Sequence, residues 1–186
     1  MGDFYTNVTL AGAALEAVLE ALGSRHALVA AVGERILVFD QACESQDPSV
    51  LSTLCAELSS RVGCAALGVL NHDDDVLMLM LFGGGRLLTD YNSCPGYFDG
   101  DELPPSEVDA VALCAAFGVE QAAPQVRVIL ASEDDDVSFA TDRHQALVDA
   151  MALPAQSVGY GYDYLAQGEV PEGLDASDLI ETGGDV

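Results

Sequence analysis

The sequence predicts an α+β fold in one compact domain, built on a mostly antiparallel sheet. Half of the 186 residues are hydrophobic, which supplies a sizeable core and excludes global disorder. Several strand-like runs follow one another across very short turns, and such turns force neighbouring strands to be antiparallel. Helix-like segments with apolar residues at a spacing of three and four separate some of these runs. The predicted order is β-α-β-β-α-β-β-β, followed by a smaller α-β-α-α part.

The first part of the chain, residues 1–98, holds the predicted antiparallel core. Two helices are indicated, one ended by Gly23 and one that begins after Asp47, which we expect to be its N-cap because Pro48 suits the first helical position. The helices are expected at residues 13–22 and 48–62, and the strands at residues 4–10, 27–32, 35–40, 65–70, 76–82 and 86–92. The run 76–82 is apolar at every position, which predicts a central strand covered by helices on at least one side.

The remainder of the chain divides into a linker, a smaller part and a tail. Residues 99–105 form an acidic, proline-rich linker, and residues 106–168 are expected to pack on the core as a smaller α/β part. In that part we expect helices at 106–117, 142–153 and 156–167, the first of them capped by Ser106, and a strand at 125–131. Residues 169–186 carry six acids and no base, which indicates an extended or mobile tail.

The sign of the charge is unusual, although its amount is ordinary. The chain has 31 acidic residues against six basic ones, a net charge of −25, and every base is an arginine. Such a balance repels phosphate backbones and anionic membrane surfaces, so we expect no nucleic-acid or membrane partner. It favours cations or a basic protein partner, and it also serves solubility alone.

The five cysteines are scattered, and none belongs to a C-x-x-C pair. Cys55 and Cys114 lie in apolar helical stretches, and the N-terminus lacks a basic segment followed by an apolar run. We therefore expect reduced thiols in a cytoplasmic protein, without a zinc site. The glycine run before Arg86 is not a phosphate-binding loop, because that motif requires a lysine.

Two aspartate triplets are the most distinctive local features: Asp73, Asp74 and Asp75, and Asp134, Asp135 and Asp136. Adjacent carboxylates repel one another, and a hard cation such as Mg²⁺ or Ca²⁺ with oxygen ligands would relieve that repulsion. If the two turns met, a metal site could use Asp73, Asp75, Asp134 and Asp136, with His72 as a further ligand or base. The alternative is ordinary turn chemistry, because aspartate hydrogen-bonds to its local backbone.

A tyrosine segment supplies candidate anchors for a partner, namely Tyr160, Tyr162 and Tyr164. Tyrosine buries a large apolar area and keeps a polar tip, which suits an interface; packing against the core is the alternative.

These features predict a soluble binding protein rather than an enzyme, without a cofactor. Its acidic turns and tail would contact a basic protein surface, as an inhibitor or antidote does. The first alternative is a divalent-metal-dependent hydrolase that uses the two aspartate turns and Mg²⁺ or Ca²⁺. The second is a structural or assembly subunit that associates through the tyrosine segment.

Overall fold

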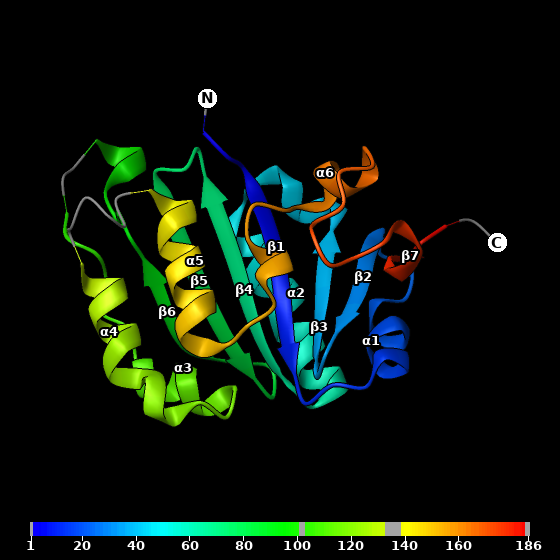
Figure 1. The fold of residues 1–186 in the computed structure, drawn as a ribbon, viewed down its shortest axis with the longest axis horizontal. Helices are drawn as coiled ribbons and strands as arrows, with labels where there is room; N and C mark the ends of the chain where they lie inside the picture. Colours follow the sequence, from blue (N-terminus) through cyan, green and yellow to red (C-terminus); the bar gives the residue numbers. More distant parts are fainter. Residues whose placement is uncertain (1, 101–102, 133–138, 185–186) are drawn as a thin grey trace.

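The protein folds around one antiparallel sheet with helices on both faces (Figure 1), which confirms the α+β prediction. The computed structural model describes residues 2–100, 103–132 and 139–184. In these residues the sheet has seven strands in the order β6-β5-β4-β1-β3-β2-β7. Strand β1 is therefore central, and the chain adds strands to either side of it.

The strands are β1 (Tyr5–Ala11), β2 (Ala27–Val32), β3 (Arg35–Asp40), β4 (Ala65–His72), β5 (Val76–Gly83), β6 (Arg86–Asn92) and β7 (Ile180–Thr182). The α-helices are α1 (Leu15–Leu22), α2 (Pro48–Val62), α3 (Ala110–Ala116), α4 (Ala123–Ala131), α5 (Ala140–Met151) and α6 (Tyr162–Ala166). The first eight elements follow the predicted order β-α-β-β-α-β-β-β.

Helices α1 and α2 cover one face of the sheet. The apolar side chains of α2 pack against β1, β4 and β5, and Leu51, Leu54 and Leu58 are almost fully buried there. Helix α2 begins as predicted, because the carboxylate of Asp47 accepts a hydrogen bond from the Ser49 N–H and Pro48 occupies the first turn.

Helices α3, α4, α5 and α6 cover the opposite face. The first three pack over β4, β5 and β6, while α6 belongs to a smaller apolar cluster over β2 and β3. Strand β5 is buried from both sides, since Leu77, Leu79 and Leu81 join the α3–α5 cluster and Phe82 joins the α2 cluster.

Two predictions in the second part of the chain are wrong. The segment expected to be a strand at 125–131 lies in helix α4, so the predicted order α-β-α-α does not hold. Its run of β-branched residues suggested a strand, but the buried side chains Val126 and Leu130 are four residues apart while Val128 is 69% exposed. That spacing places one apolar stripe on a helix.

The cap of α3 also differs from the expectation. Asp109, rather than Ser106, is the N-cap, and its carboxylate accepts from the N–H groups of Val111 and Ala112. Ser106 instead bonds to β6, because its hydroxyl accepts from the Asn92 N–H and its own N–H donates to the Asn92 carbonyl.

The acidic C-terminal segment contains the short strand β7, which extends the sheet at β2. Ile180 pairs with Val29, and the Thr182 hydroxyl donates to the Arg25 carbonyl at 2.7 Å. Three residues are too few for a clear sequence pattern, and the prediction of an extended tail did not include this strand.

Candidate functional site at the acidic end of the sheet

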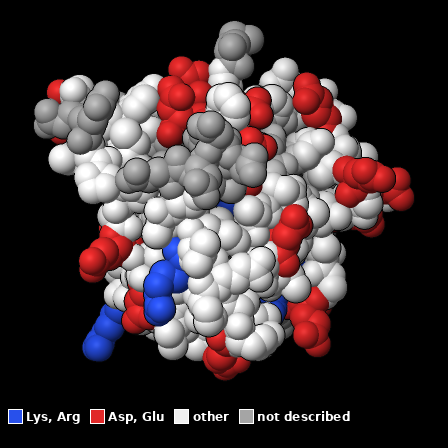
Figure 2. All heavy atoms as spheres, turned by 60° about the vertical axis from the view of Figure 1, so that its left-hand side comes forward, with Lys and Arg blue, Asp and Glu red and all other residues white. Residues whose placement is uncertain are grey.

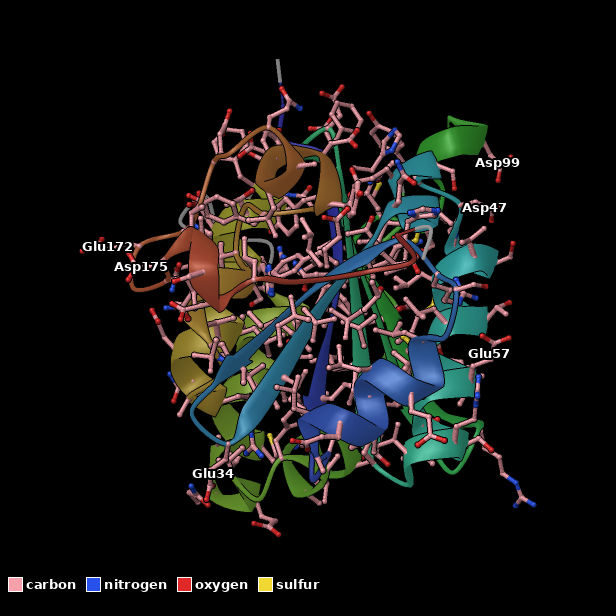
Figure 3. The ribbon with its side chains drawn as sticks, turned by 90° about the vertical axis from the view of Figure 1, so that its right-hand side faces the viewer. Glu34, Asp47, Glu57, Asp99, Glu172 and Asp175 are labelled. Atoms are coloured by element: carbon pink, nitrogen blue, oxygen red, sulfur yellow. The ribbon has the colours of Figure 1, made fainter. Side chains whose placement is uncertain are left out.

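The antiparallel topology gathers acidic residues at one end of the sheet. The N-terminus of β1, the β4–β5 turn and the segments after β3 and β6 all lie there, because adjacent strands run in opposite directions. We call this region the acidic end, and it comprises Asp3, Glu44, Asp47, Asp73, Asp74, Asp75 and Asp99. In Figure 3, Asp47 and Asp99 project outward toward this end, whereas Glu34 lies at the opposite end.

Arginines mark the opposite end. Arg35 and Arg86 are the first residues of β3 and β6, and Arg61 lies in the last turn of α2. On the face drawn in Figure 2, the most prominent arginine side chains lie in the lower half, and Asp and Glu side chains lie at the top, at the sides and at the bottom. Arg35, Arg61 and Arg86 therefore lie at one end of the strands, whereas acidic residues are found at both ends, Glu34 among them.

The β4–β5 turn, which carries the first aspartate triplet, is a tight hairpin. Asp73 and Asp74 have positive φ angles of 54° and 60°, and the Asp75 N–H donates to the His72 carbonyl at 3.1 Å. Positive φ at both central residues is typical of the turn that matches the twist of paired strands, and aspartate tolerates it better than most residues. Turn geometry thus accounts for aspartate at these positions.

The three carboxylates of this turn bind three different segments. Asp73 accepts from the Gly2 N–H at 3.0 Å, Asp74 from the Thr141 N–H at 2.8 Å, and Asp75 from the Tyr97 hydroxyl at 3.0 Å. The turn therefore joins the N-terminus, the start of α5 and the segment after β6.

Asp74 caps helix α5 from a distant part of the sequence. The N-cap residue of α5, Phe139, makes no side-chain cap bond. Asp74 replaces it, since its carboxylate accepts from the Thr141 N–H and its carbonyl accepts from the Ala140 N–H at 2.8 Å. A negative charge at this position also interacts favourably with the helix dipole.

Glu44 makes a similar tertiary cap on α6. Its Oε1 accepts from the Tyr162 N–H at 2.6 Å, and Gly161 lies so close that an added Cβ would contact the same oxygen at 2.6 Å. Burial raises the pKa of Glu44 to about 7, although the backbone N–H of Tyr162 favours the charged form. Glu44 therefore titrates near neutral pH.

The metal-site hypothesis stays a prediction. Asp134, Asp135 and Asp136 lie outside the described residues, so their position relative to Asp73 and Asp75 is not part of the structure. His72 lies between two aromatic rings, with centroids 5.0 Å from Phe4 and 6.0 Å from Tyr97. Within the described residues, no group of three or more His, Cys, Asp or Glu side chains is placed to hold a metal ion. Calorimetry with Mg²⁺, Mn²⁺ and Ca²⁺ tests the hypothesis.

The predicted tyrosine anchors largely pack the segment around α6 onto the sheet. Tyr162 is buried in the cluster over β2 and β3, and Tyr160 packs against the same cluster. Tyr164 is half-buried against the α3–α5 cluster. All three contribute to packing, which leaves their role as partner contacts a prediction.

A buried polar group beneath α5 was missed by the sequence reasoning. The Tyr5 hydroxyl and His144 Nδ1 lie 2.8 Å apart, their rings stack at 5.7 Å, and both side chains are almost fully buried. Burial lowers the pKa of His144 to about 3 and raises that of Tyr5, so the pair is neutral. The sequence signal for this group was the alternation of polar residues along 5–11. Asn7, two residues after Tyr5, faces the same side of the sheet and donates to the Ser157 and Tyr160 carbonyls.

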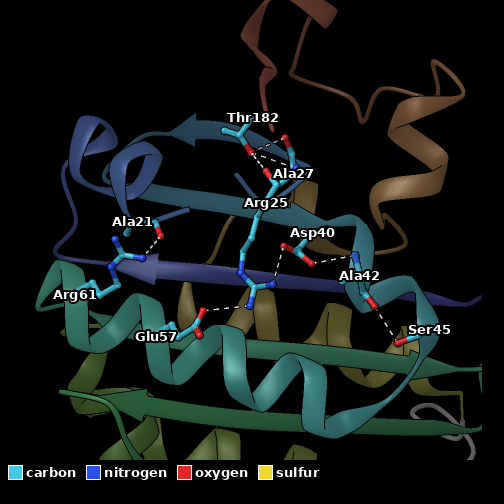
Figure 4. A network of polar contacts seen from close by, with 9 residues as sticks. All are labelled: Ala21, Arg25, Ala27, Asp40, Ala42, Ser45, Glu57, Arg61 and Thr182. Carbon is cyan, nitrogen blue, oxygen red and sulfur yellow. Dashed lines mark hydrogen bonds and ion pairs between the residues drawn. The ribbon is translucent and has the colours of Figure 1, made fainter. Parts of the chain in front are cut away.

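The arginines near the acidic end are already engaged. Arg25 forms ion pairs with Asp40 at 3.3 Å and Glu57 at 3.1 Å, while its carbonyl accepts from Thr182 (Figure 4). Arg143 is buried and donates to the carbonyls of Ile129, Leu130 and Ser132 at the end of α4. Among the described residues, neither guanidinium forms an ion pair with the exposed carboxylates of Asp3, Asp75 or Asp99.

Comparisons with protein-family models, curated proteins and solved structures give no match. In the described part of the chain, no helix has the length and apolar character needed to cross a bilayer. Functional inference therefore depends on the acidic end and on the surfaces of the fold.

Proposed function

We propose that the protein is a non-enzymatic binding protein whose acidic end contacts a basic protein surface, in the manner of an inhibitor or antidote. The supporting observation is the convergence of exposed acids from four separate segments at one end of the sheet. Asp3, Asp75 and Asp99 are exposed there, while Arg35, Arg61 and Arg86 lie at the other end.

The rigidity of this end supports binding over simple solubility. The β4–β5 turn is fixed by hydrogen bonds from Gly2, Thr141 and Tyr97, and Asp47 is fixed as the α2 cap. Carboxylates held by a scaffold lose little conformational entropy on binding, which favours a specific contact with arginine or lysine side chains. Their field would also accelerate encounter with a cationic partner.

The test compares two triple variants of equal net charge. Asp3→Asn, Asp75→Asn and Asp99→Asn together neutralise the acidic end, whereas Glu16→Gln, Glu20→Gln and Glu34→Gln neutralise exposed acids elsewhere. Each protein is immobilised and exposed to a cell lysate at low salt, and the captured proteins are identified by mass spectrometry. We expect the wild type and the control variant to retain a basic protein that the acidic-end variant loses.

Binding should also weaken as salt rises, because screening shortens the range of the attraction to about 8 Å at physiological ionic strength. Recovery of no basic protein would refute the proposal. Equal loss in both triple variants would show that diffuse charge, rather than the acidic end, retains the partner.

A further inference from the structure

Three aromatic side chains meet at the acidic end. Phe4 comes directly before β1, His72 is the last residue of β4, and Tyr97 opens the short turn Tyr97–Asp99 that follows β6. The His72 ring centroid lies 5.0 Å from that of Phe4 and 6.0 Å from that of Tyr97. Figure 3 shows Asp99, and with it this turn, on the side of the sheet that carries α2. We call these three rings the aromatic cluster.

The geometry of the rings leaves part of their faces exposed. The interplanar angles with His72 are 85° for Phe4 and 73° for Tyr97, so each pair is an edge-to-face contact. In such a contact one ring presents only its edge, and its partner does not cover its faces. Phe4 is 37% exposed, and His72 and Tyr97 are partly exposed. An aromatic face carries partial negative charge, so an exposed cluster of this kind attracts a cation.

Carboxylates border the aromatic cluster. The three segments that contribute it, residues 2–4, 71–75 and 96–100, contain five aspartates and neither lysine nor arginine. The Asp75 carboxylate accepts from the Tyr97 hydroxyl at 3.0 Å and therefore lies at the edge of that ring. A carboxylate has about four acceptor positions, so this bond leaves others for the N–H groups of a partner. The cluster therefore complements a cation through its rings and through its border.

The protein itself shows how a guanidinium can use a ring and an acceptor together. At the opposite end of the sheet, the Arg35 guanidinium lies 5.4 Å from the Phe117 ring centroid and donates to the Phe117 carbonyl at 2.7 Å. A guanidinium is planar, so it can stack on a ring while the N–H groups at its edge donate to a carboxylate. The ammonium of lysine is compact and strongly hydrated, and it gains less from such a surface. Arginine is therefore the cation that fits the aromatic cluster best.

We propose that the aromatic cluster receives an arginine side chain of the basic partner, with the guanidinium over a ring face and Asp75 as an acceptor of its N–H groups. The inference rests on the proposed binding of a basic protein and specifies the residue at the centre of that contact. A few arginine and aromatic side chains commonly dominate the binding energy of an interface. The other acids of this end would steer the partner and border the contact.

Binding of two model peptides to the full chain tests the proposal. A Gly-Arg repeat peptide and a Gly-Lys repeat peptide of equal length carry the same charge, and calorimetry at low salt measures their dissociation constants. We expect the arginine peptide to bind the wild type more tightly than the lysine peptide does. Phe4→Leu combined with Tyr97→Leu should weaken the arginine peptide about two- to fivefold, the loss expected for one exposed cation–π contact, and should weaken the lysine peptide less.

Phe139→Leu is the matched control for removal of a ring. Phe139 is 56% exposed and lies at the start of α5, on the opposite face of the sheet, so this variant should keep the preference for arginine. Thermal melts followed by circular dichroism establish that the variants are folded. Equal binding of the two peptides to the wild type, or a preference for arginine that survives in the double variant, would overturn the inference.

The acidic-end triple variant separates this inference from the proposed function. If the wild type binds both peptides equally and Asp3→Asn, Asp75→Asn and Asp99→Asn together abolish both, the acidic end binds cations without the aromatic cluster, and the inference alone fails. If the triple variant binds both peptides as tightly as the wild type, the acidic end is not the contact and the proposed function fails with it.

Discussion

The two faces of the sheet bury different kinds of side chain. On the α1–α2 face the core is apolar, and the nearby ion pair of Arg25 and Asp40 lies at its border with the guanidinium partly exposed. On the α3–α6 face, the core includes His144 and Tyr5, and the Arg143 guanidinium is almost completely enclosed. The first face depends on burial of apolar area, which changes little with pH, and the second depends on titratable groups held in one protonation state.

The largest expected consequence is a loss of stability in acid that originates on the α3–α6 face. The pKa of His144 is about 3 in the folded protein, below its ordinary value of 6.5. The unfolded chain therefore binds a proton that the folded chain excludes, and the free energy of unfolding should fall as pH drops from 6.5 toward 3. One fully buried imidazole contributes up to about 3–5 kcal/mol across that window. Urea titrations at a series of pH values measure it.

A single and a double variant assign this effect to the Tyr5–His144 pair. Tyr5→Phe alone leaves a buried imidazole nitrogen without its hydroxyl partner and should cost about 1–3 kcal/mol at pH 7. His144→Leu combined with Tyr5→Phe removes both polar groups and should abolish this contribution to the acid dependence. An unchanged slope between pH 6.5 and 3 in the double variant would assign the acid sensitivity to other groups.

Arg143 gives the next largest effect. Its guanidinium donates to the Ile129 carbonyl at 2.7 Å and to the Ser132 carbonyl at 2.8 Å, and it places a positive charge at the C-terminus of α4. Arg143→Met should cost about 2–4 kcal/mol, because the buried carbonyls lose their donors. Arg61→Met is the matched control, because Arg61 also donates to a carbonyl near a helix end, that of Ala21, but its side chain is exposed. This variant should lose less than about 1 kcal/mol of unfolding free energy. Equal costs for the two variants would contradict the role of burial.

The sequence predicted those parts of the fold whose signals are local. The hairpin of β2 and β3, the three strands β4–β6 and the start of α2 all depend on turns or caps within a few residues. The start of α5 does not, because its cap is Asp74, 67 residues away in the chain. The α4 segment failed for a related reason, since its valines and isoleucine favour a strand locally while packing against α3 and α5 selects the helix.

The same limit applies to the acidic end. Its individual acids are visible in the sequence, and the Asp73–Asp75 turn was identified from them. In the sequence, Asp3 precedes that turn and Asp99 follows it, both at a distance. They meet at the same end of the sheet because of the strand order, which the sequence does not show locally. The buried Tyr5–His144 pair joins residues 139 apart, a distance that no local pattern spans.

The two kinds of helix cap can be compared directly. Asp74→Gly removes the distant cap of α5 while suiting the φ of 60°, and Asp47→Ala removes the local cap of α2. Loss of a cap costs about 1 kcal/mol, and we expect Asp74→Gly to reach about 2 kcal/mol because it also weakens the attachment of the β4–β5 turn to α5, which then depends on the bond from the Ala140 N–H to the carbonyl of residue 74. Denaturant midpoints measure both changes. Faster amide exchange at Thr141 in Asp74→Gly alone would localise the effect, and protection equal to the wild type would contradict it.

Glu44 provides the smallest and most diagnostic effect, because its sign is opposite to that of His144. The pKa of Glu44 is about 7 in the folded protein, above its ordinary value of 4.5, so the folded state holds a proton that the unfolded chain releases. Its contribution to stability is therefore present below pH 4.5 and is lost as pH rises to 7.

Glu44→Gln removes this dependence and keeps an oxygen that can accept from the Tyr162 N–H. Above pH 7 the variant should be more stable than the wild type by about 1 kcal/mol, a value reduced for partial solvent exposure. A variant that is less stable than the wild type at pH 8 would show that the charged cap of α6 outweighs the cost of burying the carboxylate.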